Sequence, residues 1–278
     1  MSGGIELFRM KAKQILGYGI WEILVFIIIA SGAPLIQDGP AFVPGIPPDL
    51  ARGLSPGTQS FIGLDYIYYQ FVITILAMSI FVLKVLVFDF GTNLEQGIET
   101  SYLLLPVKRS RLLLPVYLLG VVLPYAVASA SVFYALYLVH MQFTLYNAAA
   151  ISLLDFLPLL FICSVTLLVT MKSRSSVAAL GVAIVMFFSM GLFLGLNQTI
   201  VYKTHSFAPL VILGLLFPAG AVNDFFSFPY ALPPSGIFSS APSFLSIFPW
   251  LVAGAVLINI ALLVAVFWYW GRRFQISD

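Results

Sequence analysis

The chain has 278 residues, of which 61% are hydrophobic and only 9% are charged, and its mean hydropathy is +1.04. Soluble globular domains contain about half apolar and about a quarter charged residues, so this composition excludes that class and indicates an integral membrane protein. The formal charge of +2 is too small to predict a nucleic-acid partner. Membrane lipids, in the cell (plasma) membrane, are the expected surroundings.

Residues 3–17 precede the first long apolar run and have a two-sided pattern. Apolar residues recur at helical spacing on one side, and charged residues share the other. The apolar set is Ile5, Phe8, Ala12, Ile15 and Leu16, and the charged set is Glu6, Arg9 and Lys13. This pattern predicts an amphipathic helix in the cytoplasmic interface. The alternative is a simple extension of the first membrane span.

Six apolar runs are long enough to cross a membrane, since about 30 Å of hydrocarbon requires about 20 helical residues. The runs are approximately Tyr18 to Ile36, Tyr66 to Phe88, Leu112 to Val139, Ala149 to Met171, Ser176 to Leu196 and Ile247 to Trp270. A seventh stretch, residues 207–222, is short and interrupted by proline and glycine, which favours a re-entrant or interfacial segment. The sequence therefore predicts an all-α, polytopic membrane protein with six transmembrane helices in a single domain, residues 1–278.

Lysine and arginine are unevenly distributed between the two sides of the predicted bundle. One side has Arg9, Lys11 and Lys13, then Lys108, Arg109 and Arg111, then Lys172 and Arg174, and finally Arg272 and Arg273; the other has Arg52 and Lys203. Lys84 lies within the second run, close to its cytoplasmic end, where it can snorkel. Because basic residues accumulate inside the cell, both termini are predicted to be cytoplasmic. Residues 198–245 then form an extracellular loop that contains the re-entrant segment.

The polar interruption at residues 89–111, the 89–111 loop, separates the second and third runs. Thr92 followed by Glu95 fits a capping box, and Pro106 is a stop signal, so the pattern predicts a short cytoplasmic helix over residues 93–105. The side expected to be buried consists of Leu94, Ile98 and Leu105. The side expected to face water or a partner consists of Glu95, Glu99, Lys108 and Arg109. Composition alone would equally allow an ordinary solvated loop.

The segment from Gly97 to Arg109, GIETSYLLLPVKR, resembles a loop of the permease subunits of ABC-2 type transporters. The matching residues are Gly97, Leu103, Pro106 and Arg109. The layout of an amphipathic N-terminal helix, six spans and a long last outside loop is similar as well. Ile98 stands where that family usually has threonine, and the resemblance assigns no substrate.

The resemblance implies that the chain is the transmembrane subunit of an ATP-binding cassette exporter. Its 89–111 loop would be a coupling helix that docks on a separate P-loop ATPase subunit, which binds ATP and Mg. A second permease copy or a paralogue would complete the transporter. The residues implied in ATPase coupling are Leu94, Glu95, Gly97, Ile98, Glu99, Pro106, Lys108 and Arg109.

The chain is not expected to be an enzyme or to hold a cofactor itself. It has no Gly-x-x-x-x-Gly-Lys-[Ser/Thr] segment, so it is not expected to hydrolyse ATP. His140 and His205 lack a second ligand at metal-binding spacing, and the single cysteine, Cys163, is interpreted as an apolar filler. The alternative function is a non-transporting membrane anchor or assembly subunit. A membrane-embedded transferase would need clustered acids or histidines, which the sequence does not contain.

Two carboxylates lie within the predicted spans, Glu22 early in the first and Asp155 in the fourth. Acids inside a membrane are candidates for a pathway or for an interhelix polar contact because burying them is costly. Glu22 fits an interfacial position. For Asp155 a structural hydrogen bond to a neighbouring span is favoured over a role in a pathway.

Overall fold

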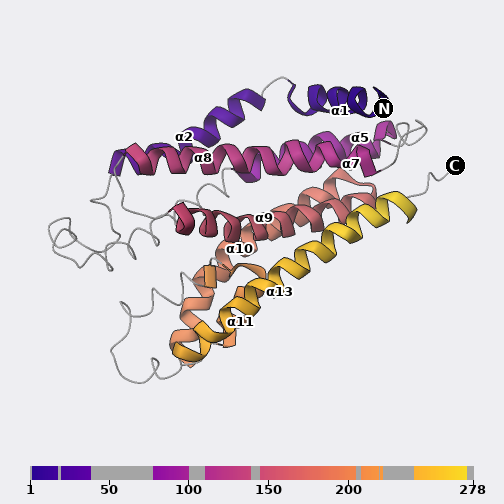
Figure 1. Ribbon diagram of the computed structural model, residues 1–278. Helices are drawn as coiled ribbons and strands as arrows, with labels where there is room; N and C mark the ends of the chain where they lie inside the picture. The colour runs from indigo at the N-terminus through magenta and orange to yellow at the C-terminus, as the bar shows by residue number, and fades with distance from the viewer. Residues whose placement is uncertain are drawn as a thin grey trace.

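The computed structural model describes residues 2–17, 20–38, 78–99, 110–138, 145–204, 208–218, 220–221 and 241–273. These residues are almost entirely helical and none of them lies in a strand (Figure 1). Three helices are long and apolar enough to cross a membrane, and a fourth is added if a bent pair near the N-terminus counts as one span. The three are Leu112–Ala135, Ser152–Ser173 and Ser246–Arg272. The chain is thus an all-α, multi-pass membrane protein.

The bent pair lies in α1 (Ser2–Ile15) and α2 (Ile20–Asp38): its two segments, Phe8–Ile15 and Ile20–Ala33, are bent by 67° relative to each other. Helix α1 is therefore a helix distinct from α2, as the two-sided sequence pattern predicts, and does not simply extend it. Helix α2 packs along α8 (Leu123–Leu138) (Figure 1). A Cβ atom on Gly32 would lie 2.6 Å from Ser131 Oγ, and that hydroxyl donates a hydrogen bond to Ile28 O at 2.9 Å. Small residues at such a contact let two helix backbones approach closely.

Two stretches of π-helix meet in the middle of the bundle. The π-helix η2 (Leu83–Gly91) continues into α5 (Thr92–Glu95), and η3 (Leu118–Val122) joins α7 (Ser110–Tyr117) to α8. A Cβ atom on Gly120 would lie 2.6 Å from Val85 Cγ1, so the two stretches are in direct contact. The helix of the second apolar run, described over residues 78–95 and called here the second helix, thus continues past Phe88, where that run is expected to end, because backbone hydrogen bonding continues into the polar residues.

The other half of the bundle contains α9 (Leu145–Ser173), α10 (Ser176–Thr204), α11 (Ala208–Leu216), α13 (Ala241–Trp268) and the π-helix η5 (Tyr269–Arg273). Helix α10 extends past Leu196 into residues expected to form the outside loop. Helix α11 packs on α13, since Cβ atoms on Gly214 and Gly254 would lie within 2.8 Å of Leu251 and Leu215 side chains, respectively. The re-entrant or interfacial position of residues 207–222 remains a prediction.

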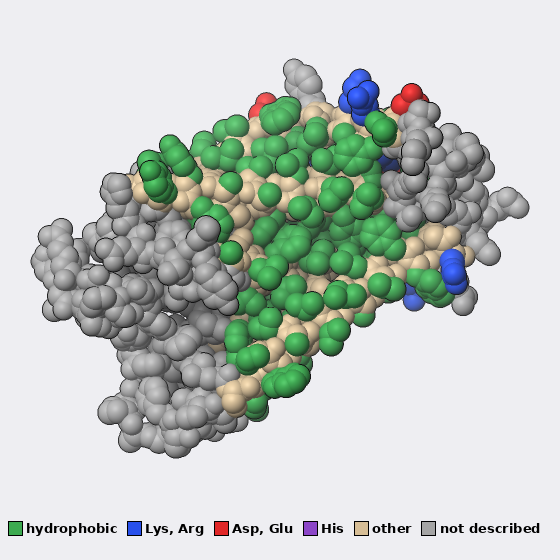
Figure 2. Space-filling model, viewed as in Figure 1, with side chains coloured by type: hydrophobic (Ala, Val, Ile, Leu, Met, Phe, Trp, Pro, Cys, Tyr) green, Lys and Arg blue, Asp and Glu red, His purple; other side chains and the backbone are tan. Residues whose placement is uncertain are grey.

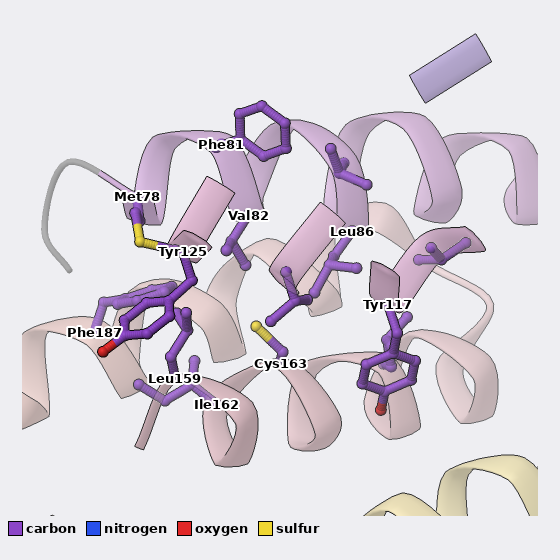
Figure 3. Close-up of a cluster of buried hydrophobic side chains, with 14 of the residues drawn as sticks. Met78, Phe81, Val82, Leu86, Tyr117, Tyr125, Leu159, Ile162, Cys163 and Phe187 are labelled. Atoms are coloured by element: carbon purple, nitrogen blue, oxygen red, sulfur yellow. The ribbon is translucent and has the colours of Figure 1, made fainter. Parts of the chain in front are cut away.

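A buried apolar cluster joins the second helix, α7, α8, α9 and α10 (Figure 3). Cys163 is completely buried in this cluster, which confirms its role as an apolar filler. The described part of the face shown in Figure 2 is mainly hydrophobic, and the lysine and arginine side chains visible on it lie towards the end at which α1 begins and η5 ends. That distribution suits a bundle surrounded by lipid, with a polar end in water.

The contact between Gly120 and Val85 yields a prediction about stability. Gly120→Ala forces a methyl group against the stiff side chain of Val85, and overpacking of this kind costs about 1–3 kcal/mol. Gly181→Ala is the matched control because a Cβ at Gly181 in α10 meets nothing within 4 Å. Thermal unfolding of the purified protein in detergent should show a lower midpoint only for Gly120→Ala. Equal midpoints for the two variants would contradict the close contact.

Candidate functional site

The described part of the 89–111 loop forms the end of the second helix and a sharp turn. Helix α5 ends at Glu95, and the amides of Gln96 and Gly97 bond to the carbonyls of Thr92 and Leu94 at 2.9 and 3.2 Å. Gly97 has φ 77°, a conformation that glycine adopts without steric cost. The helix predicted over residues 93–105 is therefore interrupted at Gly97. Residues 100–109, with Pro106, Lys108 and Arg109, lie outside the described residues.

Glu99 forms a buried ion pair with Lys11 of α1, and each side chain is only 2% exposed. The prediction that Glu99 faces water or a partner is therefore wrong: its side chain is buried and pairs with Lys11 of α1. Burial raises the pKa of Glu99, whereas the attraction of Lys11 and its hydrogen bond act in the opposite direction. The pair joins two segments that are 88 residues apart in the sequence.

Glu95, the last residue of α5, is exposed, and its carboxylate lies next to the first residue of α10, Ser176. Its Oε2 accepts hydrogen bonds from the Ser176 hydroxyl at 2.6 Å and from the Ser176 amide at 3.1 Å. The hydroxyl bond, and then the amide bond, lower the pKa of Glu95. A carboxylate in this position satisfies a free helix amide and complements the positive end of the helix dipole.

The capping box predicted between Thr92 and Glu95 is not formed. Gly91, the residue before α5, is itself helical and no side-chain hydrogen bond caps α5. Thr92 continues the preceding π-helix, so its amide already has a helical environment and needs no cap. The carboxylate of Glu95 instead caps a different helix, α10.

Aromatic and apolar contacts connect the same region to the C-terminal end of the bundle. Phe90 and Trp270 of η5 are buried, with ring centroids 5.8 Å apart at an angle of 55°. Leu94 is buried, as predicted, whereas Ile98 is 38% exposed and the prediction of its burial is wrong. The turn at Gly97 rotates Ile98 away from the face that continues from Leu94. Residues 89–99 therefore contact α1, α10 and η5 together.

Lys84 and Asp89 form a second ion pair in η2, with Nζ and Oδ1 2.6 Å apart. The five-residue spacing corresponds to the i→i+5 hydrogen-bond repeat of a π-helix, so the two side chains lie on one face. The lysine within the second apolar run thus has a carboxylate partner near the cytoplasmic end predicted for that run.

Three residues of the site escape prediction from the loop sequence: Lys11, Ser176 and Trp270. Lys11 does leave a signal, because it lies four residues before the buried Ile15 and on the apolar side of α1, away from Arg9 and Lys13. A lysine on a buried helix face requires an acidic partner, and Glu99 supplies it. The sequence holds no comparable signal for Ser176.

The two acids of the predicted spans take no part in the contacts of residues 89–99 described above. Glu22 is exposed on α2, whereas Asp155 of α9 is 2% exposed. In the part of the chain that the structure describes, no group of three or more histidine, cysteine or acidic side chains has the arrangement of a metal site.

Comparisons of the chain with protein-family models, with curated proteins and with solved structures found no match. The loop motif and the contacts of residues 89–99 therefore carry the functional interpretation.

The ion pair yields a prediction about double substitutions. Glu99→Gln removes the charge of Glu99 from its buried pair with Lys11 and should cost about 3–5 kcal/mol of unfolding free energy. The double variant Lys11→Met, Glu99→Leu should recover most of this loss, because a packed apolar pair removes both charges. Thermal unfolding measures the stability of both variants. Lys13→Met, which changes an exposed lysine of α1, is the control. A double variant as unstable as Glu99→Gln would show that the buried charge is not the cause.

The Glu95 cap yields a pH prediction. Since the pKa of Glu95 is lowered from 4.5, its stabilising contribution is present above about pH 4.5 and is lost as the pH falls through the lower pKa of the folded state. The unfolding midpoint of the wild type should exceed that of Glu95→Gln at neutral pH, and the difference should shrink on acidification. Glu6→Gln, at an exposed glutamate of α1, is the control and should keep the wild-type profile. A difference that grows on acidification would contradict the cap.

Proposed function

We propose that this chain is the transmembrane subunit of an ATP-binding cassette exporter of the ABC-2 permease type, driven by a separate P-loop ATPase subunit. The observation that carries the proposal is the set of contacts that join residues 89–99 to α1, α10 and η5. A solvated loop without a partner can be stable without such contacts. A loop that transmits force from a soluble partner requires them, because they connect its displacement to the membrane helices.

Each contact provides a separate route for displacement. The Glu95 carboxylate holds the first residue of α10, so a movement of α5 pulls or pushes the end of that helix. The Lys11–Glu99 pair carries the same movement to α1. The packing of Phe90 against Trp270 carries it to the end of α13. Helices are stiff over the thickness of a membrane, so displacement at one end tilts the whole helix.

The proposed partner contacts the exposed surface of the turn. Gln96 and Ile98 are exposed there, next to the exposed Glu95. An exposed isoleucine surrounded by polar groups suits an apolar anchor that enters a pocket of another protein. In the proposed complex, two permease chains, identical or paralogous, bind two ATPase subunits that hold ATP and Mg²⁺. Closure of the ATPase subunits then presses on this turn from the cytoplasm.

The proposal predicts that Ile98→Asp separates the ATPase from the permease without unfolding the chain. Loss of one buried apolar anchor costs about 1.4–3 kcal/mol, which corresponds to a fall in ATPase affinity of about tenfold or more. Co-purification of a P-loop ATPase and its ATP turnover in lipid measure the effect. Ile5→Asp is the matched control, since Ile5 is an exposed isoleucine on α1.

The outcomes separate transport from anchoring. Transport requires that a nucleotide-hydrolysing partner co-purifies with the wild type and is lost with Ile98→Asp, while the unfolding midpoint and the Ile5→Asp complex are unchanged. A native complex that contains no such ATPase would contradict the proposal and would favour a non-transporting anchor or assembly subunit.

A further inference from the structure

A cluster of hydroxyl groups lies between α8 and α9, away from the 89–111 loop. The Tyr125 hydroxyl donates to Ser152 O at 2.6 Å, and the Ser152 hydroxyl donates to Ser129 Oγ at 3.2 Å. Tyr125 also packs on Phe156, with ring centroids 5.0 Å apart. Polar side chains inside a membrane bundle gather in this way because each must find a partner in place of water.

Asp155 lies one turn after Ser152 on the same face of α9 and is 2% exposed. The phenol of Tyr125 is within electrostatic range of its carboxyl group. The Oδ2 atom is buried and has no hydrogen-bond partner. The structural hydrogen bond that is predicted between Asp155 and a neighbouring span is therefore not formed by this oxygen.

Asp155 is in no ion pair in the part of the chain whose side chains the structure describes. The ion pairs there join Lys11 to Glu99 and Lys84 to Asp89. The described residues of η3, α8, α11 and α13, all from the bundle around α9, include no charged side chain. Lys172 of α9 is more than four turns away from Asp155, about 25 Å along the helix. The side chain of Lys203, next to the C-terminus of α10, lies outside the described side chains.

We propose that Asp155 is a proton-binding site, in which the carboxyl group holds a proton at neutral pH and the hydroxyls of Tyr125, Ser129 and Ser152 form its polar wall. A buried carboxylate without a counter-charge costs several kcal/mol, whereas the neutral acid loses little in the same surroundings. Protonation also turns one carboxyl oxygen into a donor, so the acid gains an O–H group to offer to a hydroxyl oxygen. The site is separate from the coupling contacts and does not depend on them.

Infrared spectroscopy of the purified protein in lipid tests the protonation state directly. A protonated carboxylic acid has a carbonyl stretch that an ionised carboxylate lacks. The wild type at neutral pH should show this band, and Asp155→Asn should lose it. Glu22→Gln is the matched control, because Glu22 is exposed, and should keep the band. A wild-type spectrum that Asp155→Asn leaves unchanged would overturn the proposal.

Two further measurements distinguish a proton from other occupants. Asp155→Asn copies the shape of the neutral acid, so it should keep the unfolding midpoint of the wild type; a large loss of stability would mean that the group is ionised and paired. Addition of sodium or potassium chloride at constant pH should leave the carbonyl band unchanged. Loss of the band on addition of either salt would identify a metal-cation site instead and would also overturn the proposal.

Discussion

The buried ion pair between Lys11 and Glu99 is the constraint around which the polar end of the molecule is organised. Two charges removed from water are stable only while they remain paired, so separation of α1 from Glu99 would break a buried ion pair at a cost in free energy. This fixes the N-terminal helix at the point where the second helix ends. The contacts of Glu95 with Ser176 and of Phe90 with Trp270 then tie that point to the rest of the bundle.

The membrane character and the helical fold follow from composition and from the length of the apolar runs. The runs beginning at Leu112, Ala149 and Ile247 are found as long helices within a few residues, because hydrocarbon thickness sets their length. Tyr66 to Phe88 lies mostly outside the described residues. Helix ends are less predictable, since backbone hydrogen bonds continue into polar residues, as in α5 and at the end of α10.

The site is only partly predictable from sequence. The burial of Leu94 agrees with the local pattern, because helical periodicity is a local property, whereas the turn at Gly97 interrupts the helix that the same pattern predicts over residues 93–105. The burial of Glu99 depends on α1, and the role of Glu95 depends on α10, so neither follows from the loop alone. The π-helices also escape prediction, since an apolar run has the same composition whether its backbone bonds span four residues or five.

The central claim is that a nucleotide-hydrolysing protein touches the turn at residues 96–98. A photo-reactive amino acid placed at the exposed Gln96, activated in native membranes, tests it most directly, with the cross-linked protein identified by mass spectrometry. The account predicts a cross-link to a protein that contains a P-loop, and a weaker cross-link when ATP is withheld. Cross-links confined to lipid, to this chain itself or to proteins without a nucleotide site would contradict it.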